Sequence, residues 1–152
     1  MKQFVYLIGF LLLALACKET FEAPPQSLLV ASIYNSKTNK TMSPVATAQG
    51  VDNRMVLFGD TTVSSILFPL TFKDTTRYIV WLDATSDSLT FVHQAIKKYD
   101  SMETGFYYEY KLLSVRFTSN RIDSVKITDS LVTKKWNENI KLYIHPLPAG
   151  GI

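Results

Sequence analysis

Short runs in which apolar and polar residues alternate, separated by polar turns, fill the chain from Leu28 to Ile144. Successive side chains of a β-strand point to opposite faces, so this two-residue period is typical of strands that bury one face. The runs are also rich in Val, Ile, Thr, Tyr and Phe, which strands prefer. We therefore predict strands at residues 28–34, 45–51, 54–58, 65–72, 77–82, 88–99, 106–117, 121–127 and 140–144.

Local breaks in the alternation predict where some of these strands end or bend. Gly59 and Asp60 predict a turn that stops the third strand. Pro69 has no backbone N–H to donate, so its strand is expected at a sheet edge or at a bulge. Residues 121–127 place apolar side chains on both faces, which suggests a bulge or a twist in that strand.

Two segments are compatible with more than one structure. Residues 88–99 begin with strict alternation, but Phe91, Ala95 and Tyr99 are also spaced as on one helix face. We favour a strand there because the neighbouring segments are strands. Residues 129–139 are the best place for a short helix or a long loop. About seven to nine strands, with turns about every eight to twelve residues, predict an all-β fold: an antiparallel β-sandwich of broadly immunoglobulin-like shape.

The N-terminal segment has a different character. Lys2 is its single basic residue, an uncharged apolar run extends from Phe4 to Ala16, and Cys17 follows directly. This order is typical of an export signal. The apolar run has 13 residues, whereas a helix needs roughly 20 to cross the hydrocarbon core of a bilayer. We therefore expect residues 1–16 to be removed rather than to remain as a membrane span.

The segment from Leu13 to Cys17 resembles a bacterial lipoprotein box, in which the signal is cleaved before a cysteine that carries a diacylglyceryl group on its sulfur. The resemblance implies lipidation of Cys17, which would give a role to the only cysteine of the chain. Each buried CH₂ contributes about 0.8 kcal/mol, so two or more acyl chains anchor a protein stably. Ala14-Leu15-Ala16 also fits an ordinary secretory site with the same cut, so simple secretion stays open.

After the signal we predict a flexible tether at residues 17–27 and a single β-sandwich domain at residues 28–152. The tether is polar and contains two prolines, which favour extended backbone. Lys18 and Glu19 resemble the charged export tags of some Bacteroidota surface lipoproteins, or are simply two charged residues in a solvated linker. Removal of the signal leaves 136 of the 152 residues, which is enough for one hydrophobic core.

The charged residues are balanced and interleaved along the chain. Sixteen basic and thirteen acidic residues give a formal net charge of +3, and no basic run is longer than two lysines. This pattern does not favour a nucleic-acid partner. If the lone cysteine carries lipid, the domain has no internal disulfide, so its stability depends on its core.

Few residues are candidates for catalysis or metal binding. His93 and His145 are the only histidines, and no serine lies in a Gly-x-Ser-x-Gly turn. We predict that His93 is packed in the fold or lies at a surface edge, and that His145 ends a strand. Two distant histidines do not make a zinc site. Asp74, Asp83 and Asp87 lack the spacing of a calcium loop and are expected to be solvated turn residues. We therefore predict no catalytic residue, no metal and no cofactor.

The longest predicted strand offers one candidate ligand contact. If Phe106, Tyr108, Tyr110 and Leu112 face the core, then Tyr107 faces outward. An outward tyrosine can stack against a sugar or a protein surface at low cost in side-chain entropy. The alternative is that Tyr107 covers a sheet face or packs under a loop.

The order of segments as a whole resembles a group of small uncharacterised lipoproteins from Bacteroidota. The resemblance is carried by Asp-Ser-Leu-Thr-Phe at residues 87–91, by Gly105-Phe106, by residues 122–127 and by the closing strand. It implies a cell-envelope location and a fold without implying a reaction.

Together these features predict a non-catalytic, lipid-anchored protein of the outer membrane, facing the periplasm or the surface. It would act as a binding or structural module, with the membrane as one partner and another envelope protein or a glycan as a second. The alternative function is that of a carbohydrate-binding surface lipoprotein that uses exposed aromatic side chains. A hydrolase built around His93 is a third hypothesis.

Overall fold

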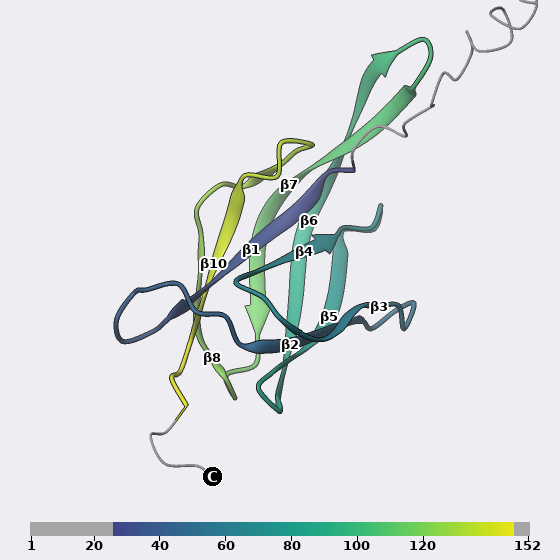
Figure 1. Ribbon diagram of the computed structural model, residues 1–152. Helices are drawn as coiled ribbons and strands as arrows, with labels where there is room; N and C mark the ends of the chain where they lie inside the picture. Colours follow the sequence, from purple (N-terminus) through teal and green to yellow (C-terminus); the bar gives the residue numbers. More distant parts are fainter. Residues whose placement is uncertain (1–25, 148–152) are drawn as a thin grey trace, which may run out of the picture.

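The computed structural model describes residues 26–147, which form ten β-strands and no helix (Figure 1). The strands are β1 (Leu28–Asn35), β2 (Val45–Gly50), β3 (Val56–Thr62), β4 (Ser65–Pro69), β5 (Thr75–Leu82), β6 (Thr85–Ser101), β7 (Gly105–Phe117), β8 (Ile122–Ile127), β9 (Leu131–Val132) and β10 (Glu138–Ile144). The predicted signal, Cys17 and most of the predicted tether lie outside the described residues, as do residues 148–152.

The strands form two sheets that pack on a shared core. A four-stranded sheet has the order β4-β1-β10-β8, and a six-stranded sheet has the order β3-β2-β5-β6-β7-β9. The predicted all-β sandwich is therefore confirmed. The strand pairs are antiparallel except for one, because β1 and β10 pair in parallel. These strands come from opposite ends of the described chain, so no tight hairpin has to join them.

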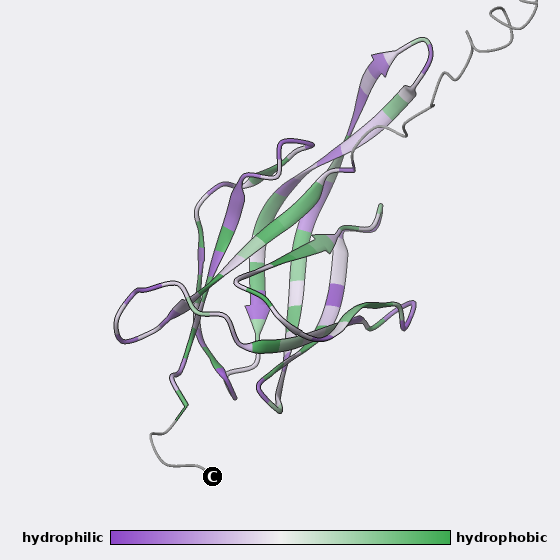
Figure 2. Ribbon diagram, in the orientation of Figure 1, coloured by the Kyte–Doolittle hydropathy of each residue, from purple (hydrophilic) through white to green (hydrophobic). Residues whose placement is uncertain are grey.

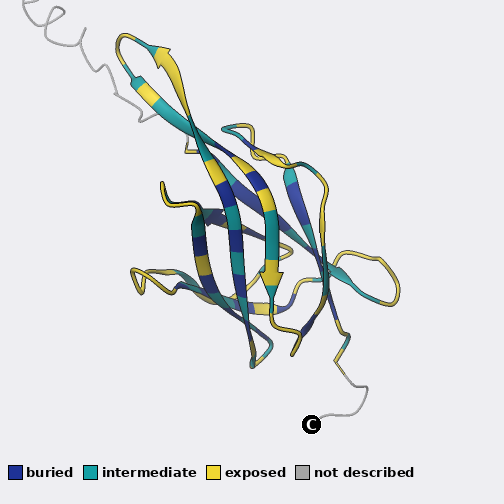
Figure 3. Cartoon of the chain, turned by 180° about the vertical axis from the view of Figure 1, so that it is seen from behind, coloured by how far each residue is buried: buried dark blue, intermediate teal, exposed yellow. Residues whose placement is uncertain are grey.

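The core is built from alternate residues of the strands, as the two-residue period predicts. Bands of apolar and polar residues alternate along the strands in Figure 2, and buried and exposed bands alternate in Figure 3. Leu89 and Phe91 of β6 are fully buried, and Phe91 packs on Phe68 of β4 with ring centroids 5.2 Å apart. Tyr78 of β5 lies 4.8 Å from Phe68. Since full burial of such a side chain contributes about 1.5–3 kcal/mol, this contact between the two sheets is a main source of stability.

Several local predictions are confirmed. Residues 88–99 lie within the long strand β6, so the strand was the correct choice over a helix. Pro69 is the last residue of β4, which lies at an edge of its sheet. The strand β8 contains a bulge, because Tyr143 pairs with Ser124 while Ile144 pairs with Ile122.

Two other local predictions are wrong. Strand β3 does not stop at Gly59 but continues through Asp60 to Thr62, with irregular register against β2. Asp60 has a φ of 43°, a conformation that a bulge in an edge strand accommodates. Residues 129–139 form neither a helix nor a long loop: they contain β9, a turn and the start of β10. A strand of two residues is too short to show a period in the sequence.

The expectation that Asp87 is a solvated turn residue is also wrong, because it joins the two sheets. Its side chain is buried and accepts hydrogen bonds from the backbone N–H groups of Arg121 and Ile122, at 2.7 and 2.9 Å. It also accepts from the Thr118 hydroxyl and the Asn120 N–H, both at 2.8 Å. The β6 carboxylate therefore fixes the corner at which the chain leaves the six-stranded sheet and enters β8.

A second acidic residue supports the same corner. Asp83 Oδ2 accepts a 2.7 Å hydrogen bond from the buried guanidinium of Arg121, and its Oδ1 accepts from the Val45 N–H at 3.1 Å. The Asp83 side chain is only 22% exposed, so it too is a structural residue rather than a freely solvated one. Asp74, by contrast, is exposed as predicted.

Strands β6 and β7 continue past the sandwich as a projecting hairpin (Figure 1). Its turn spans residues 102–104 and closes on Gly105, whose φ of +73° lies in the left-handed region that glycine adopts without strain. The described part of the chain contains no apolar helix of membrane-spanning length.

Candidate functional site

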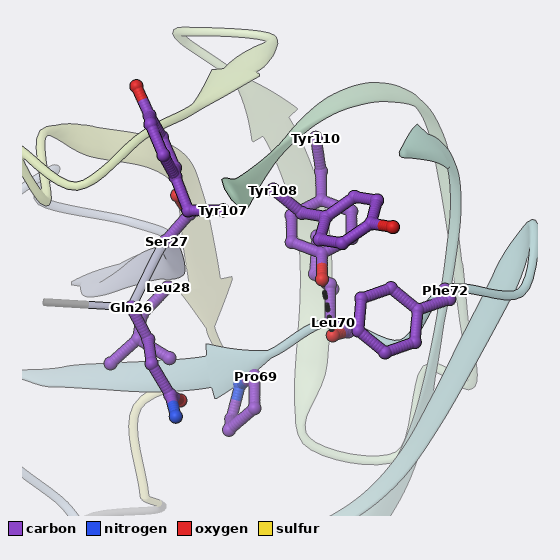
Figure 4. Close-up of a pocket in the computed structure, with 9 residues that line it drawn as sticks. All are labelled: Gln26, Ser27, Leu28, Pro69, Leu70, Phe72, Tyr107, Tyr108 and Tyr110. Carbon is purple, nitrogen blue, oxygen red and sulfur yellow. Dashed lines mark hydrogen bonds between the residues drawn. The ribbon is translucent and has the colours of Figure 1, made fainter. Parts of the chain in front are cut away.

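A cleft of about 360 Å³ lies at the end of the sandwich where the described chain begins (Figure 4). This volume is within the range of small-molecule sites, about 300–1,000 Å³. Three segments that are distant in sequence line it: Gln26, Ser27 and Leu28 at the start of β1, Pro69, Leu70 and Phe72 at and after the end of β4, and Tyr107, Tyr108 and Tyr110 of β7.

Two buried tyrosines hold the segment that follows β4 and so determine the shape of the cleft. The Tyr78 hydroxyl donates to the Pro69 carbonyl at 2.5 Å, and the Tyr110 hydroxyl donates to the Leu70 carbonyl at 3.0 Å. Burial raises the pKa of Tyr78 to about 12 and also raises the pKa of Tyr110 above its usual value. Both hydroxyls therefore stay protonated at neutral pH and keep two consecutive carbonyls in place.

One side of the cleft is an aromatic pair. The rings of Phe72 and Tyr108 lie close together with centroids 4.6 Å apart and planes tilted by 59° (Figure 4). Phe72 is 71% exposed, which is unusual for so large an apolar side chain. Ser27, which also lines the cleft, is buried, and its Oγ has no hydrogen-bond partner among the described residues. An apolar wall beside an unsatisfied hydroxyl is the combination found in sites for small ligands.

The start of the described chain is fixed at this cleft by the turn between β9 and β10. Trp136 Nε1 donates a 2.7 Å hydrogen bond to the Gln26 carbonyl. Two residues earlier, Lys134 Nζ lies 2.8 Å from Asp100 Oδ1 on the projecting hairpin. One short turn therefore links the start of the chain to the hairpin, and the cleft lies beside both.

Tyr107, the ligand contact predicted from the sequence, is half-buried at the back of this region. Lys134 Nζ lies 3.6 Å from the centroid of its ring, and its hydroxyl donates to Glu109 at 3.3 Å. In Figure 4 the Tyr107 ring points away from Tyr108 and Phe72. The ring therefore has a protein cation on one face, whereas Phe72 presents more of its surface to solvent.

The predicted orientation of the same strand is correct in its inner part and wrong near the hairpin turn. Tyr110 and Leu112 are buried as predicted, but Phe106 is 59% exposed. Alternation places Phe106 on the core face, yet the hairpin at that point extends past the sandwich, so within residues 26–147 the opposite sheet does not cover the side chain.

His93 is packed inside the fold, as one of the predicted alternatives has it. Its Nε2 lies 2.8 Å from the Thr76 hydroxyl, which lies 3.0 Å from the Thr71 hydroxyl. Burial lowers the pKa of His93 below its ordinary value, and nearby Asp74 opposes this only in part. The hydrogen-bond partner of this imidazole is Thr76, and within residues 26–147 no serine or carboxylate makes the hydrogen bond to it that a hydrolytic triad requires.

The remaining candidates are also structural. His145 directly follows β10, as predicted, and its Nε2 lies 3.7 Å from Asp123 on the exposed surface. Within the described residues, no three His, Cys, Asp or Glu side chains are grouped as metal ligands would be.

Sequence reasoning missed Phe72, Tyr108 and Ser27 as site residues. Phe72 was assigned to a strand and Tyr108 to the core face, while Ser27 was assigned to the tether. Their signal is weak because the cleft forms only when β1, β4 and β7 are brought together. The one clue in the sequence is Pro69, which ends β4 and leaves the following segment free to turn outward.

Comparison with known proteins gives one match. Residues 44–144, about two thirds of the chain, match the family of unknown function DUF6452. No curated protein and no solved structure matches this chain. The match begins just before β2 and ends with β10, so it covers all of the sandwich except β1. The chain therefore belongs to the DUF6452 family of unknown function.

Proposed function

We propose that this protein is a non-catalytic binding module, held at the cell envelope by lipid on Cys17. The order of residues 1–17 supports the anchor: a basic start, an apolar run too short to span a bilayer, and the only cysteine of the chain. The resemblance to Bacteroidota lipoproteins supports an outer-membrane location.

The observation that carries the binding role is the cleft at the N-terminal end of the sandwich. Its aromatic wall pairs half-buried Tyr108 with Phe72, which stays exposed although the fold buries other aromatic side chains, such as Phe68 and Phe91, completely. Exposed apolar surface of this kind is unfavourable in water unless a ligand or partner covers it. The cleft is held by hydrogen bonds to two backbone carbonyls, so it is preformed and a ligand need not order it.

A carbohydrate is the second, more specific candidate for the ligand. A sugar ring offers C–H groups that pack against aromatic faces and hydroxyls that pair with polar groups. The cleft provides both elements. The Phe72–Tyr108 pair is the aromatic surface, and the Ser27 hydroxyl, which has no hydrogen-bond partner among the described residues, is the polar group. These features support Phe72 and Tyr108 as the favoured contacts, rather than Tyr107 alone.

The test is a glycan-array screen of the wild-type protein, followed by titration of any glycan that binds. Phe72→Ala and Tyr108→Ala should each weaken binding about tenfold, which corresponds to about 1.4 kcal/mol. Leu113→Ala is the matched control, because Leu113 is also an exposed apolar residue of β7 but does not line the cleft.

Three results would contradict the assignment. If Phe72→Ala and Tyr108→Ala bind a recognised glycan as tightly as wild type, the cleft is not the site. If only Tyr107→Ala weakens binding, the ligand contacts the face beside Lys134 instead. If the wild type recognises no glycan at all, the carbohydrate candidate fails.

A further inference from the structure

The exposed aromatic side chains of the described chain are all at one end of the molecule. Phe72, Tyr99, Phe106 and Trp136 are 71, 58, 59 and 45% exposed, and every other aromatic residue between 26 and 147 is buried or half-buried. Met102, at the tip of the hairpin, is 96% exposed. Phe72 belongs to the cleft, and we call the other four residues, Tyr99, Met102, Phe106 and Trp136, the aromatic end.

Contacts between segments show that these residues share one end of the sandwich. Phe72 packs on Tyr108 of the β6–β7 hairpin. Trp136 is tied to Gln26, and its neighbour Lys134 is tied to Asp100 next to the hairpin turn. In Figure 3 the far part of the hairpin is coloured as exposed and half-buried residues, with none of the deep burial seen in the sandwich.

The hairpin is ordered by its own contacts rather than by cover from another element. The rings of Tyr99 and Phe106 pair across the strands with centroids 5.4 Å apart, and Lys97 Nζ lies 4.2 Å from the Phe106 centroid. At the turn, the Thr104 hydroxyl donates to Asp100 at 2.7 Å. The strands continue about six residues past Ala95, which is ~20 Å at a rise of about 3.4 Å per residue. The structure thus holds an apolar tip away from the core.

We propose that the aromatic end lies in the headgroup region of the bilayer to which Cys17 is anchored. This inference rests on the proposed anchor. Eight residues lie between Cys17 and Gln26, so even a fully extended tether, at about 3.3–3.6 Å per residue over the nine steps from Cys17 to Gln26, reaches only roughly 30 Å. Since Trp136 fixes Gln26 at the same end as the hairpin, the anchor would draw that end toward the lipid.

The chemistry of the aromatic end suits a membrane interface. Aromatic side chains with one polar edge concentrate at the boundary between headgroups and hydrocarbon. Lysines beside them can extend their charged ends toward water while their stems cover apolar surface. Glu103 follows Met102 at the tip of the hairpin. A charged carboxylate is unfavourable in hydrocarbon, so it limits insertion of the tip to the level of the headgroups.

The charged residues near the aromatic end predict that its binding to a bilayer does not require anionic lipids. Four lysines and three acidic residues lie on residues 97–109 and 133–136, which leaves a net charge of only +1. They are Lys97, Lys98, Lys134, Lys135, Asp100, Glu103 and Glu109. Two of the lysines are already paired, Lys134 with Asp100 and Lys98 with Glu109. The apolar side chains therefore supply most of the attraction, and added salt should change it little.

The experiment reads the position of the hairpin directly in the full-length protein. Met102→Cys is purified from the producing cell, labelled with the environment-sensitive dye NBD and reconstituted in phosphatidylcholine nanodiscs. The matched control is Thr38→Cys, which places the dye on an exposed turn between β1 and β2, away from the cleft. Mass spectrometry of the N-terminal peptide reports separately whether Cys17 carries lipid.

The expected result is a shift of NBD emission to shorter wavelength, and quenching by headgroup-level nitroxide lipids, at position 102 but not at position 38. Lipid on Cys17 together with unshifted emission at position 102 would overturn the inference while leaving the anchor intact. Unmodified Cys17 would instead contradict the anchor.

A second experiment, on a variant that cannot carry lipid, tests the inference whether or not Cys17 is lipidated in the wild type. The Cys17→Ala form, labelled at position 102, is mixed with phosphatidylcholine vesicles at high lipid concentration. It should still show the shift at position 102, and replacing Tyr99 and Phe106 together by serine should weaken vesicle binding about tenfold, or about 1.4 kcal/mol. Equal signals from positions 102 and 38, or no effect of the serine replacements, would contradict it.

Discussion

Replacing the buried Asp87 should destabilise the protein far more than replacing an exposed aspartate such as Asp123. In Asp87→Ala, four donors lose their acceptor. The Thr118 hydroxyl and the Asn120 N–H belong to exposed residues, so water can replace the carboxylate for them. The N–H groups of Arg121 and Ile122 belong to residues that are only 4 and 0% exposed, so they would remain unpaired.

The magnitude follows from these two buried groups. A buried N–H left without a partner is unfavourable by about 1–3 kcal/mol, so the pair predicts a loss of about 4 kcal/mol. Domains of this size are stable by about 5–15 kcal/mol, so the loss is a large fraction of the total. Asp87→Asn keeps one oxygen for the two buried N–H groups but loses the negative charge, and about 2 kcal/mol is expected.

Urea unfolding followed by circular dichroism measures this prediction. With a slope of about 2 kcal/mol per molar urea, Asp87→Ala should lower the midpoint by about 2 M and Asp87→Asn by about 1 M. Asp123→Ala is the control, because Asp123 is exposed, accepts a 3.2 Å hydrogen bond from neighbouring Ser124 and lies 3.7 Å from His145 Nε2 at the surface. If Asp87→Ala unfolds within about 1 kcal/mol of that control, the carboxylate does not hold the corner between the sheets.

Two further predictions concern buried titratable groups. Burial lowers the pKa of His93, so the unfolded chain takes up a proton more readily and wild-type stability should fall as the pH drops below about 6.5. In urea titrations at pH 7.5 and 5, His93→Gln should therefore lose less unfolding free energy on acidification than wild type does. An equal loss in the two proteins would refute this prediction. In Tyr78→Phe, loss of the hydrogen bond to Pro69 should remove about 1 kcal/mol. The same change should abolish the tyrosine that ionises at a pKa of about 12 in an ultraviolet titration, and an unchanged titration would contradict the assignment.

The strands could be predicted from the sequence because burial on one face imposes a period of two. The long strand β6 shows this best, since Leu89, Phe91 and His93 alternate into the core while the residues between them do not. The prediction failed where local pattern and tertiary position disagree. Phe106 has the right phase for burial but lies beyond the reach of the opposite sheet, and Asp60 lies in a bulge that resembles a turn in the sequence.

The residues of the candidate site were harder to predict from the sequence than the strands. The cleft depends on contacts between β1, β4 and β7, and its central pair, Phe72 and Tyr108, is 36 residues apart. The role of Asp87 was missed for the same reason, because its four hydrogen-bond donors lie 31 to 35 residues away along the chain. An aspartate next to a turn is usually solvated, and only the packing of the two sheets gives this one buried partners.

The most direct test of the account is whether Cys17 carries lipid in the cell that makes the protein. Cells expressing wild type or Cys17→Ala are grown with an alkyne fatty acid, and the protein is isolated and coupled to a fluorophore. We predict label on wild type, no label on Cys17→Ala, and wild type in the membrane fraction. Absence of label from both proteins, with wild type released as a free secreted form, would contradict it.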